Sequence, residues 1–545
     1  MAHQPNVQLY ENYNNAFGIL KPHGDSLGGG VLFLGTYKAQ HKNCQKACIE
    51  APHCHSYVHF KKRAPALLAG HCYAVTSPGF NPTYDDTALT GVVERPCKSD
   101  DDCSLNGICT SGNCVCRAAW SGHRCETLVT LPAKRSSGYH GKNDGRNTSS
   151  WGAAVLQWHK DGFYHMWASE MTEHCGIGAW QHNSRIIHAT SPLANGAYTR
   201  KEVTWPVFAH APSVVAGPQG EFVMFFTANL ERSANEACNC CRAGRGPCDG
   251  STGPGDCAGL DWHNATQVVD LGFTYMSWTK DPNGGWSTPV KLFSSKSGDT
   301  NFSPLILANG SVIGMYRRWV KAGSRSGSRV FIATARDWRD PASYEQHRLR
   351  WEKGRQGGHF ASGELFPELG ASGAEDQFLY RDAHGYFHAF FHNMVGTGTS
   401  QQWWLNPTGG HAFSRNGLDW TYGGVAWGDP LARYDTPNGR GARISFEDGS
   451  SVRLTRFERP SFIFAGNDLR GDPTHLVASA QYGEGLRAGT SDAENNDGSC
   501  TMILPIRGGG AAQLELARGA RGGKGHGLAR GARLHGAAGR SDSGH

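Results

Sequence analysis

Residues 372–394 read SGAEDQFLYRDAHGYFHAFFHNM, and this stretch contains the unit on which the fold depends. Two adjacent carboxylates, Glu375 and Asp376, stand directly before an apolar run, and a short AHG turn leads into a second apolar run. Two apolar runs joined by a tight turn predict a pair of antiparallel strands. Adjacent carboxylates repel each other and are costly to dehydrate, so their position at the start of a buried strand indicates a functional role.

The same two-strand phrase occurs five times between residues 140 and 506. Its copies begin at Trp151, His210, Asn301, Glu375 and Glu458, and a third phrase of similar kind follows four of them. Short antiparallel strands that cannot bury their faces alone stack radially as propeller blades. The sequence therefore predicts an all-β protein in which residues 140–506 form a five-bladed β-propeller. A sandwich is the alternative, but it does not explain why each unit begins alike.

This architecture predicts one shared pocket. The first strand of each blade starts at one face of a propeller and the second strand returns to that face, so the strand starts and the following loops converge. The catalytic candidates are Glu375, Asp376 and Glu458, and the substrate-binding candidates are Trp151, Glu170, His174, Asn183, His210, Asn301, Arg317, His392 and Arg459.

Three acidic side chains near one ligand favour glycosidic cleavage, which needs one carboxyl protonated and one ionised. We expect Asp376 to be the general base and Glu458 the general acid, with Glu375 holding substrate or tuning its neighbour. Inversion is expected, and it requires the two carboxyl groups to be about 6.5 to 9.5 Å apart.

Each candidate also has a structural interpretation. The pair Glu375 and Asp376 could cap backbone amides, and Glu458 could form an ion pair with Arg459. Trp151 could pack in the core instead of stacking on a sugar.

Residues 140–506 resemble the five-bladed propeller glycosidases of glycoside hydrolase family 43. The resemblance rests on the blade count, on AEDQF at 374–378, similar to the Glu-Asp-Pro strand starts of such enzymes, and on FERPSF at 457–462. It implies hydrolysis of glycosidic bonds in polymers of arabinose, xylose or galactose, usually with inversion. The chain departs from that pattern because Trp151, His210 and Asn301 stand where the family has its acids. A non-catalytic carbohydrate-binding or cell-surface adhesion protein is therefore the alternative.

A second resemblance is weaker. The stretch SRNGLDW at 414–420 is similar to the Ser-Xaa-Asp-Xaa-Gly-Xaa-Xaa-Trp turn of sialidases, but its Asp-to-Gly spacing differs. Sialidases have six blades, so the repeat count argues against this family.

Two cysteine-rich modules precede the propeller. In residues 97–126, gaps of five, five, four, one and eight residues separate six cysteines. This spacing resembles an EGF-like module, which implies the pairs Cys97 with Cys109, Cys103 with Cys114, and Cys116 with Cys125. Residues 8–96 resemble a PAN or apple module, in which a short helix bearing two cysteines is stapled to a sheet. Both modules are expected to act as spacers or to contact proteins or glycans.

Cysteine content predicts an oxidising compartment, since ten of the 17 cysteines lie between residues 44 and 125. We therefore expect an extracellular or secretory-pathway glycoprotein with sequons at Asn147, Asn264, Asn301 and Asn309. The first residues contain no apolar leader, so we expect the natural start to lie outside this chain. The sequence contains no stretch of about 20 apolar residues, so it predicts no transmembrane segment.

The remaining cysteines lie in the propeller. The cysteines of residues 238–257 are expected to form disulfides, together with Cys175, instead of a zinc site. Cys500 is expected to keep its thiol. We predict no cofactor, although a structural calcium ion is compatible with the sequence.

The charge is concentrated at the C-terminus. Of the net charge of +6, residues 507–545 contribute seven Lys or Arg against two acidic residues, which is +5. This Gly-, Ala- and Arg-rich tail is expected to be disordered. The rest of the chain is nearly neutral and gives no support for nucleic-acid binding.

Overall fold

The computed structural model describes residues 6–15, 31–37, 40–51, 54–62, 64, 69–75, 82–140, 148–172, 175–177, 180–230, 272–293, 298–322, 325–347, 365–366, 373–394, 408–428, 442–467, 469, 471–482 and 498–509. Strands dominate these residues, so the predicted all-β class is confirmed. The expectations for His174, for residues 238–257 and for the tail beyond residue 509 lie outside the described residues.

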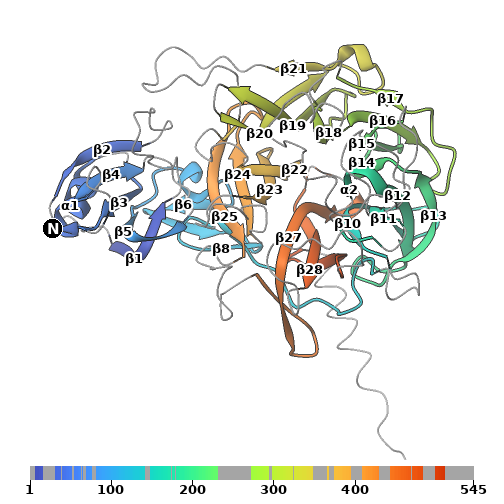
Figure 1. Cartoon of the computed structure of the whole chain (residues 1–545). Coiled ribbons are helices and arrows are strands. Elements are labelled where there is room, and N and C mark those ends of the chain that lie inside the picture. The colour runs from blue at the N-terminus through green and yellow to red at the C-terminus, as the bar shows by residue number, and fades with distance from the viewer. Residues whose placement is uncertain are drawn as a thin grey trace, which may run out of the picture.

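The N-terminal module is a five-stranded sheet with one helix (Figure 1). The sheet has the order β1-β5-β3-β4-β2, with β1 Asn6–Asn15, β2 Val31–Thr36, β3 Ser56–Phe60, β4 His71–Val75 and β5 Pro82–Glu94. Helix α1 (His41–Glu50) turns Cys44 and Cys48 toward the sheet, and both are buried. Cys44 bonds to Cys72 on β4, and Cys48 bonds to Cys54. The apple-like assignment stays a prediction, although a helix stapled to a sheet is what it implied.

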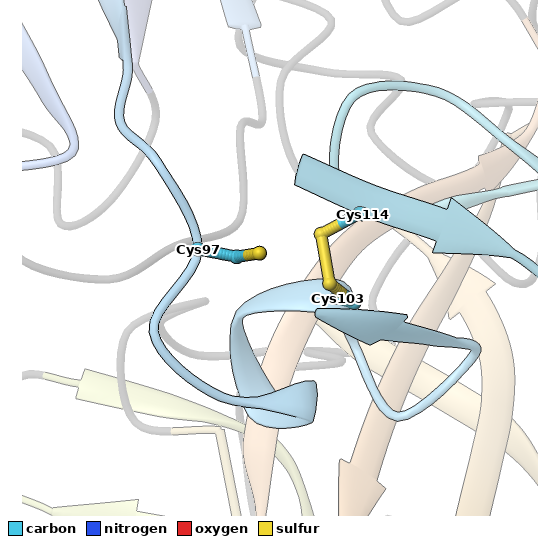
Figure 2. A group of neighbouring side chains, drawn as sticks. All are labelled: Cys97, Cys103 and Cys114. Carbon is cyan, nitrogen blue, oxygen red and sulfur yellow. A yellow bond between two sulfur atoms is a disulfide. The ribbon is translucent and has the colours of Figure 1, made fainter. Parts of the chain in front are cut away.

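The second module consists of a short 3₁₀ helix η1 (Asp100–Cys103) and two hairpins. The hairpins pair β6 (Gly107–Thr110) with β7 (Asn113–Cys116) and β8 (Trp120–Ser121) with β9 (Thr127–Leu128). All three predicted disulfides are present: Cys97–Cys109, Cys103–Cys114 and Cys116–Cys125. The sulfur atoms of Cys97, Cys103 and Cys114 lie close together (Figure 2), but each belongs to a disulfide and offers no thiolate to a metal.

Five four-stranded antiparallel sheets follow, here called sheets one to five. Sheet one consists of β10 Ser150–Gln157, β11 Tyr164–Met171, β12 Ser184–Ser191 and β13 Thr199–Trp205, with the short helix α2 Trp180–Asn183 before β12. Sheet two consists of β14 Ala209–Ala216, β15 Phe222–Ala228, β16 Phe273–Thr279 and β17 Val290–Lys291, and sheet three of β18 Thr300–Ile306, β19 Val312–Ala322, β20 Arg325–Ala335 and β21 Glu345–His347. Sheet four consists of β22 Ala374–Arg381, β23 Phe387–Asn393, β24 Thr408–Ser414 and β25 Thr421–Trp427, and sheet five of β26 Arg443–Ser445, β27 Ser451–Phe464, β28 Pro473–Tyr482 and β29 Cys500–Pro505. Cys500 on β29 is buried and keeps its thiol, as expected.

The inner strands of the five sheets contact one another in a ring. β10 contacts β14, β14 contacts β18, β18 contacts β22, β22 contacts β27, and β27 contacts β10 again. Figure 1 shows the sheets arranged around this common centre. Because each sheet packs between two others, its inner strands are buried on both faces, which explains their nearly continuous apolar sequences.

Residues 130–139 connect the start of the ring to its end. Thr130 pairs with Ile506 and Tyr139 pairs with Thr501, both antiparallel. The amide of Leu131 donates to the carbonyl of Pro505 at 2.7 Å. The chain that precedes sheet one therefore runs along the outer side of β29 and ties the first and last sheets together.

Each inner strand carries a bulge at the same point. The register shifts at Trp151/Ala153, His210/Ser213, Thr300/Ser303, Glu375/Phe378 and Glu458/Ser461. Within each bulge one residue has a positive φ, and these five residues, the ring positions, are Gly152, Ala211, Asn301, Asp376 and Arg459. A bulge locally redirects side chains. The five bulges therefore bring one residue per sheet to the same end of the ring.

Sheet five corrects one expectation. Glu458 does not begin its strand but lies in the middle of the 14-residue β27. The three-residue strand β26 pairs with the first part of β27, whereas the part from Glu458 onward lies in the ring.

The EGF-like module is attached to sheet four. Arg117 donates to the carboxylate of Asp382 at 2.6 Å, and Asp382 is almost completely buried. Trp120 stacks on Phe390 of β23 with ring centroids 5.9 Å apart. Among the described residues, no helix is long and apolar enough to span a membrane.

Candidate active site

Four titratable side chains meet at the bulged end of the ring. They are Glu375 and Asp376 on β22, His392 on β23 and Glu458 on β27. One oxygen or nitrogen atom of each lies within 4.8 Å of those of the others. We call this group the acid cluster. Its three carboxylates are the ones that the sequence predicts to be catalytic.

Glu375 is held in its charged form. Arg317 donates to Oε2 of Glu375 at 2.6 Å, and Nδ1 of His392 lies 3.6 Å from Oε1. Burial alone would raise the pKa of Glu375, but His392 and Arg317 outweigh it and lower the pKa to about 2. Glu375 is therefore an anion at any ordinary pH.

Asp376 receives two donors on one oxygen atom. The amide of Asn301 donates to Oδ1 at 2.7 Å and the guanidinium of Arg459 donates to the same atom at 2.8 Å. Burial raises the pKa of Asp376, Arg459 opposes this effect, and the negative charge of Glu375 adds to it. The side chain of Asn301, part of a predicted sequon, is half-buried and engaged in this contact.

Glu458 has a different environment. Its side chain is 4 % exposed, and Oε1 has no hydrogen-bond partner among the described residues. Nε2 of His392 lies 3.8 Å from that oxygen atom. Burial raises the pKa of Glu458 to about 7, against the opposing charges of His392 and Arg456. Arg459 does not pair with Glu458, because it bonds to Asp376 instead.

His392 is fully buried between carboxylates. Burial would lower its pKa, but Glu458, Glu375 and Asp376 outweigh burial and raise the pKa to about 9. His392 is thus cationic at neutral pH. With Arg317 and Arg459 it supplies positive charge that opposes the three carboxylates of the cluster.

The other side of the site is aromatic. His210 accepts or shares a hydrogen bond with the hydroxyl of Ser184 at 2.7 Å, and the ring of Trp180 stacks on His210 at 4.9 Å. Burial and the charges of Arg459 and Arg317 hold the pKa of His210 well below its usual range. Trp151 is 4 % exposed and packs against Met171 and neighbouring residues, so it is a core residue.

Two substrate-binding predictions fail because the side chains have other partners. The carboxylate of Glu170 is fully buried and accepts from Arg185 at 2.6 Å and from Tyr139 at 2.6 Å. The amide of Asn183 donates to the carbonyl of Thr172 at 3.1 Å and to Sγ of Cys175 at 2.7 Å. Both residues stabilise sheet one instead of facing the acid cluster. Cys175 is disulfide-bonded, as expected.

Among the described residues, one small cavity lies at the bulged end of the ring. The lining residues include Pro212, Asn301, Asp376, Gln377 and Arg459, around a cavity of about 30 Å³. This volume holds about one or two water molecules.

Two carboxyl groups of the acid cluster approach each other closely. An oxygen atom of Asp376 lies within 4.8 Å of one of Glu458. Inverting glycosidases keep their carboxyl groups about 6.5 to 9.5 Å apart to admit a water molecule, whereas retaining enzymes use about 5 to 5.5 Å. The approach of these nearest atoms is compatible with the retaining separation, and the expected inversion stays a prediction.

Sequence reasoning missed several residues near the site. Arg456 lies two residues before Glu458, and its guanidinium is 5.8 Å from the ring of Trp151. The amide of Gln377 donates to backbone carbonyls of Asn301 and Met315. The sequence signal that could have located the ring positions is the equivalence of five short stretches, WGA, HAP, TNF, EDQ and ERP. Their middle residues are the five ring positions, one per sheet.

Comparisons with known proteins agree with this description in part. The family model described as a Teneurin-like EGF domain matches residues 99–127, which confirms the EGF-like prediction. No curated protein sequence matches the chain.

Similar solved structures are glycoside hydrolases. Zg3597, a family 117 glycoside hydrolase of the marine bacterium Zobellia galactanivorans, is 11% identical over 70% of this chain and 89% of its own, with a TM-score of 0.39. A thermostable family-43 glycoside hydrolase is 12% identical over 70% and 92%, with a TM-score of 0.36. The endo-arabinase of Bacteroides thetaiotaomicron is 11% identical over 68% and 98%, with a TM-score of 0.33.

Proposed function

We propose that the protein is a glycoside hydrolase that cleaves a polysaccharide or glycan at the acid cluster of a five-bladed β-propeller. The observation that carries the proposal is the pair Asp376 and Glu458, two buried carboxyl groups in one cluster with different partners. Burial raises the pKa of both groups, but Arg459 opposes this effect at Asp376, and glycosidic cleavage requires one protonated and one ionised carboxyl. The ring of five four-stranded sheets supports the propeller assignment.

The first step uses both carboxyl groups. Glu458 donates its proton to the glycosidic oxygen, while the ionised Asp376 attacks the anomeric carbon. The bond between that carbon and the leaving oxygen breaks, a glycosyl ester forms on Asp376, and Glu458 becomes a carboxylate. Arg459 and Asn301 hold Oδ1 of Asp376, and no hydrogen bond to Oδ2 is present among the described residues.

The second step restores the enzyme. The carboxylate of Glu458 takes a proton from a water molecule, whose oxygen attacks the anomeric carbon and displaces Asp376. The sugar leaves with its original configuration, and one water molecule has been added overall. Glu375 takes no part in bond making; it holds His392 and Arg317 in place.

Binding without cleavage is the second candidate. The observation that favours it is the engagement of Glu375 by Arg317 and of Asp376 by Arg459, which leaves each carboxylate partly occupied. In that case the pocket recognises a sugar but does not turn it over.

Turnover and product configuration test the proposal together. The full chain is assayed against aryl glycosides and against plant and algal polysaccharides, and NMR follows the first anomer released. Release of a sugar that retains its anomeric configuration supports the proposal. Sugar binding without any release supports the binding protein, and an inverted product rejects the role of Asp376 as nucleophile.

We assign the protein to the extracellular space or the secretory pathway, because five disulfides join the cysteines of its two N-terminal modules. The same modules are proposed to make protein or glycan contacts.

A further inference from the structure

We propose that Gly152 is a positioning residue, whose missing side chain leaves the space through which Arg459 reaches Asp376. The inference rests on the proposed function, since Asp376 matters only if it is the reacting carboxylate. It assigns a role to sheet one, which contributes no charged side chain to the acid cluster.

The space at Gly152 is filled by Arg459. A Cβ atom on Gly152 would lie 2.6 Å from Nε of Arg459 and 2.7 Å from Cδ. Contacts this short do not occur between real atoms, so an alanine at this position must displace the arginine side chain. The displaced groups are the ones that carry the guanidinium to Oδ1 of Asp376, which it now reaches at 2.8 Å.

Backbone conformation does not explain the glycine. Gly152 has a φ of 64°, but Ala211, Asn301, Asp376 and Arg459 adopt φ values of 61°, 54°, 56° and 49° at the equivalent ring positions. Four of the five sheets therefore accommodate a side chain in the same bulge. What distinguishes Gly152 is the arginine of the neighbouring sheet.

The charge of Arg459 has a consequence for Asp376. The guanidinium opposes the effect of burial on the pKa of Asp376, and the nearby charges of Glu375, Arg317 and His392 also act on this carboxyl. If Arg459 moves away, the pKa of Asp376 rises and its ionised fraction at a given pH falls. The reaction needs the ionised form, so the acid limb of the pH–rate profile should move to higher pH.

The experiment compares Gly152→Ala with Gly162→Ala in the full-length chain. Gly162 has a φ of 76°, and a Cβ there would meet nothing within 4 Å, so this variant controls for the backbone alone. We expect Gly152→Ala to lower kcat about 100-fold, the scale of a misplaced active-site group, and to shift the acid limb upward. Gly162→Ala should change neither property.

A double variant tests whether the effect of Gly152→Ala comes from its clash with Arg459 or from another property of the glycine. In Arg459→Ala the clash is absent, so Gly152→Ala/Arg459→Ala should turn over as fast as Arg459→Ala alone. An additional tenfold loss in the double variant would overturn the proposal. If Gly152→Ala fails to fold, folding of the double variant supports the proposal and its failure to fold overturns it.

An infrared titration of Asp376 gives a result that does not depend on turnover. The carboxyl band that disappears in Asp376→Asn is followed against pH, and Gly152→Ala should move its midpoint upward. An unchanged midpoint overturns the inference. A moved midpoint in a chain that cleaves no glycan would support the role of Gly152 in holding Arg459 and reject the proposed hydrolase function.

Discussion

Three carboxyl groups of the acid cluster have similar chemistry but different neighbours. Glu375 is paired with Arg317, Asp376 with Arg459 and Asn301, and Glu458 has no comparable cation in hydrogen-bond contact among the described residues. Burial raises the pKa of all three, and the placement of His392 and of the arginines opposes it to different extents. The different roles proposed for the three carboxyl groups follow from their neighbours on other strands.

The first prediction concerns pH. Glu458 has to be protonated to act as an acid, and its pKa is raised to about 7, so kcat/KM should fall as pH rises through about 7. Glu458→Gln should abolish this limb in the pH–rate profile measured by initial rates, whereas Glu345→Gln, at an exposed position on β21, should leave it unchanged. A limb that persists in Glu458→Gln contradicts the assignment.

Sequence patterns predicted which residues meet, but not how they pair. The rule that strand starts and the loops after second strands converge correctly placed five residues together: Glu375, Asp376, Glu458, Arg317 and His392. The patterns failed for Glu170, because its burial against Arg185 depends on two strands within sheet one. They also leave the carboxyl separation open, because no sequence spacing encodes it.

At the scale of elements, sheets one and four each contain a buried pair of histidines. Nδ1 of His165 lies 2.8 Å from Nε2 of His188, and Nδ1 of His388 lies 3.1 Å from Nε2 of His411. The rings of each pair stack at 5.0 and 5.3 Å. Such pairs are stable only while at least one ring is neutral.

The second prediction follows from the pair in sheet one. Burial, His165 and Lys201 lower the pKa of His188 to about 3, against the charges of Asp161 and Asp281. The unfolded chain takes up this proton near pH 6.5, so the stability that His188 contributes is present above that pH and is lost as pH falls toward 3. In urea unfolding, His188→Gln should show a smaller loss of stability between pH 6.5 and pH 4 than the natural chain.

A histidine on the surface provides the control. His384→Gln, at an exposed turn, should leave the pH dependence as it is. Equal pH dependence of the natural chain and His188→Gln would show that the pair does not bind protons differently in the folded state.

Strands were predictable where they were long and apolar. The five phrases correspond to the inner two strands of each sheet because both faces are buried there. The outer strands β17 and β21 have two and three residues, too few to form a pattern. For the same reason the short β26 was missed and the start of β27 was misplaced.

For the whole molecule, the EGF-like module is part of the structure that supports the site. Arg117 neutralises Asp382, which directly follows β22, and Trp120 stacks on Phe390 of β23, the strand that carries His392. The disulfide framework was readable from cysteine spacing, but this attachment was not, since no pattern in Arg117 or Trp120 specifies a partner 265 residues away.

The third prediction tests this attachment. Arg117→Met leaves the buried carboxylate of Asp382 with His388 at 3.5 Å and the backbone amides of His384 and Tyr386, and the lost charge-assisted bond should cost about 1 to 3 kcal/mol of unfolding free energy. Arg415→Ala removes an exposed ion pair with Asp101, whose partners are 50% and 46% exposed, and should cost less than about 1 kcal/mol. Urea unfolding measures both, and equal losses would contradict a structural role for Arg117.

The ring as a whole was predictable because one phrase occurs five times. Its closure by residues 130–139 was not, because isolated pairs such as Tyr139 with Thr501 leave no repeated pattern in the sequence. The chemistry proposed for the ring depends on Glu458 giving a proton to the leaving group.

The most direct measurement compares two leaving groups in Glu458→Gln. A 2,4-dinitrophenyl glycoside needs no proton from the enzyme to depart, whereas the natural glycosidic oxygen does. Glu458→Gln should lose at least about 100-fold in turnover of the natural linkage and little in the first step with the dinitrophenyl glycoside, with folding unchanged. Equal losses on both substrates, or no loss on either, would contradict this prediction.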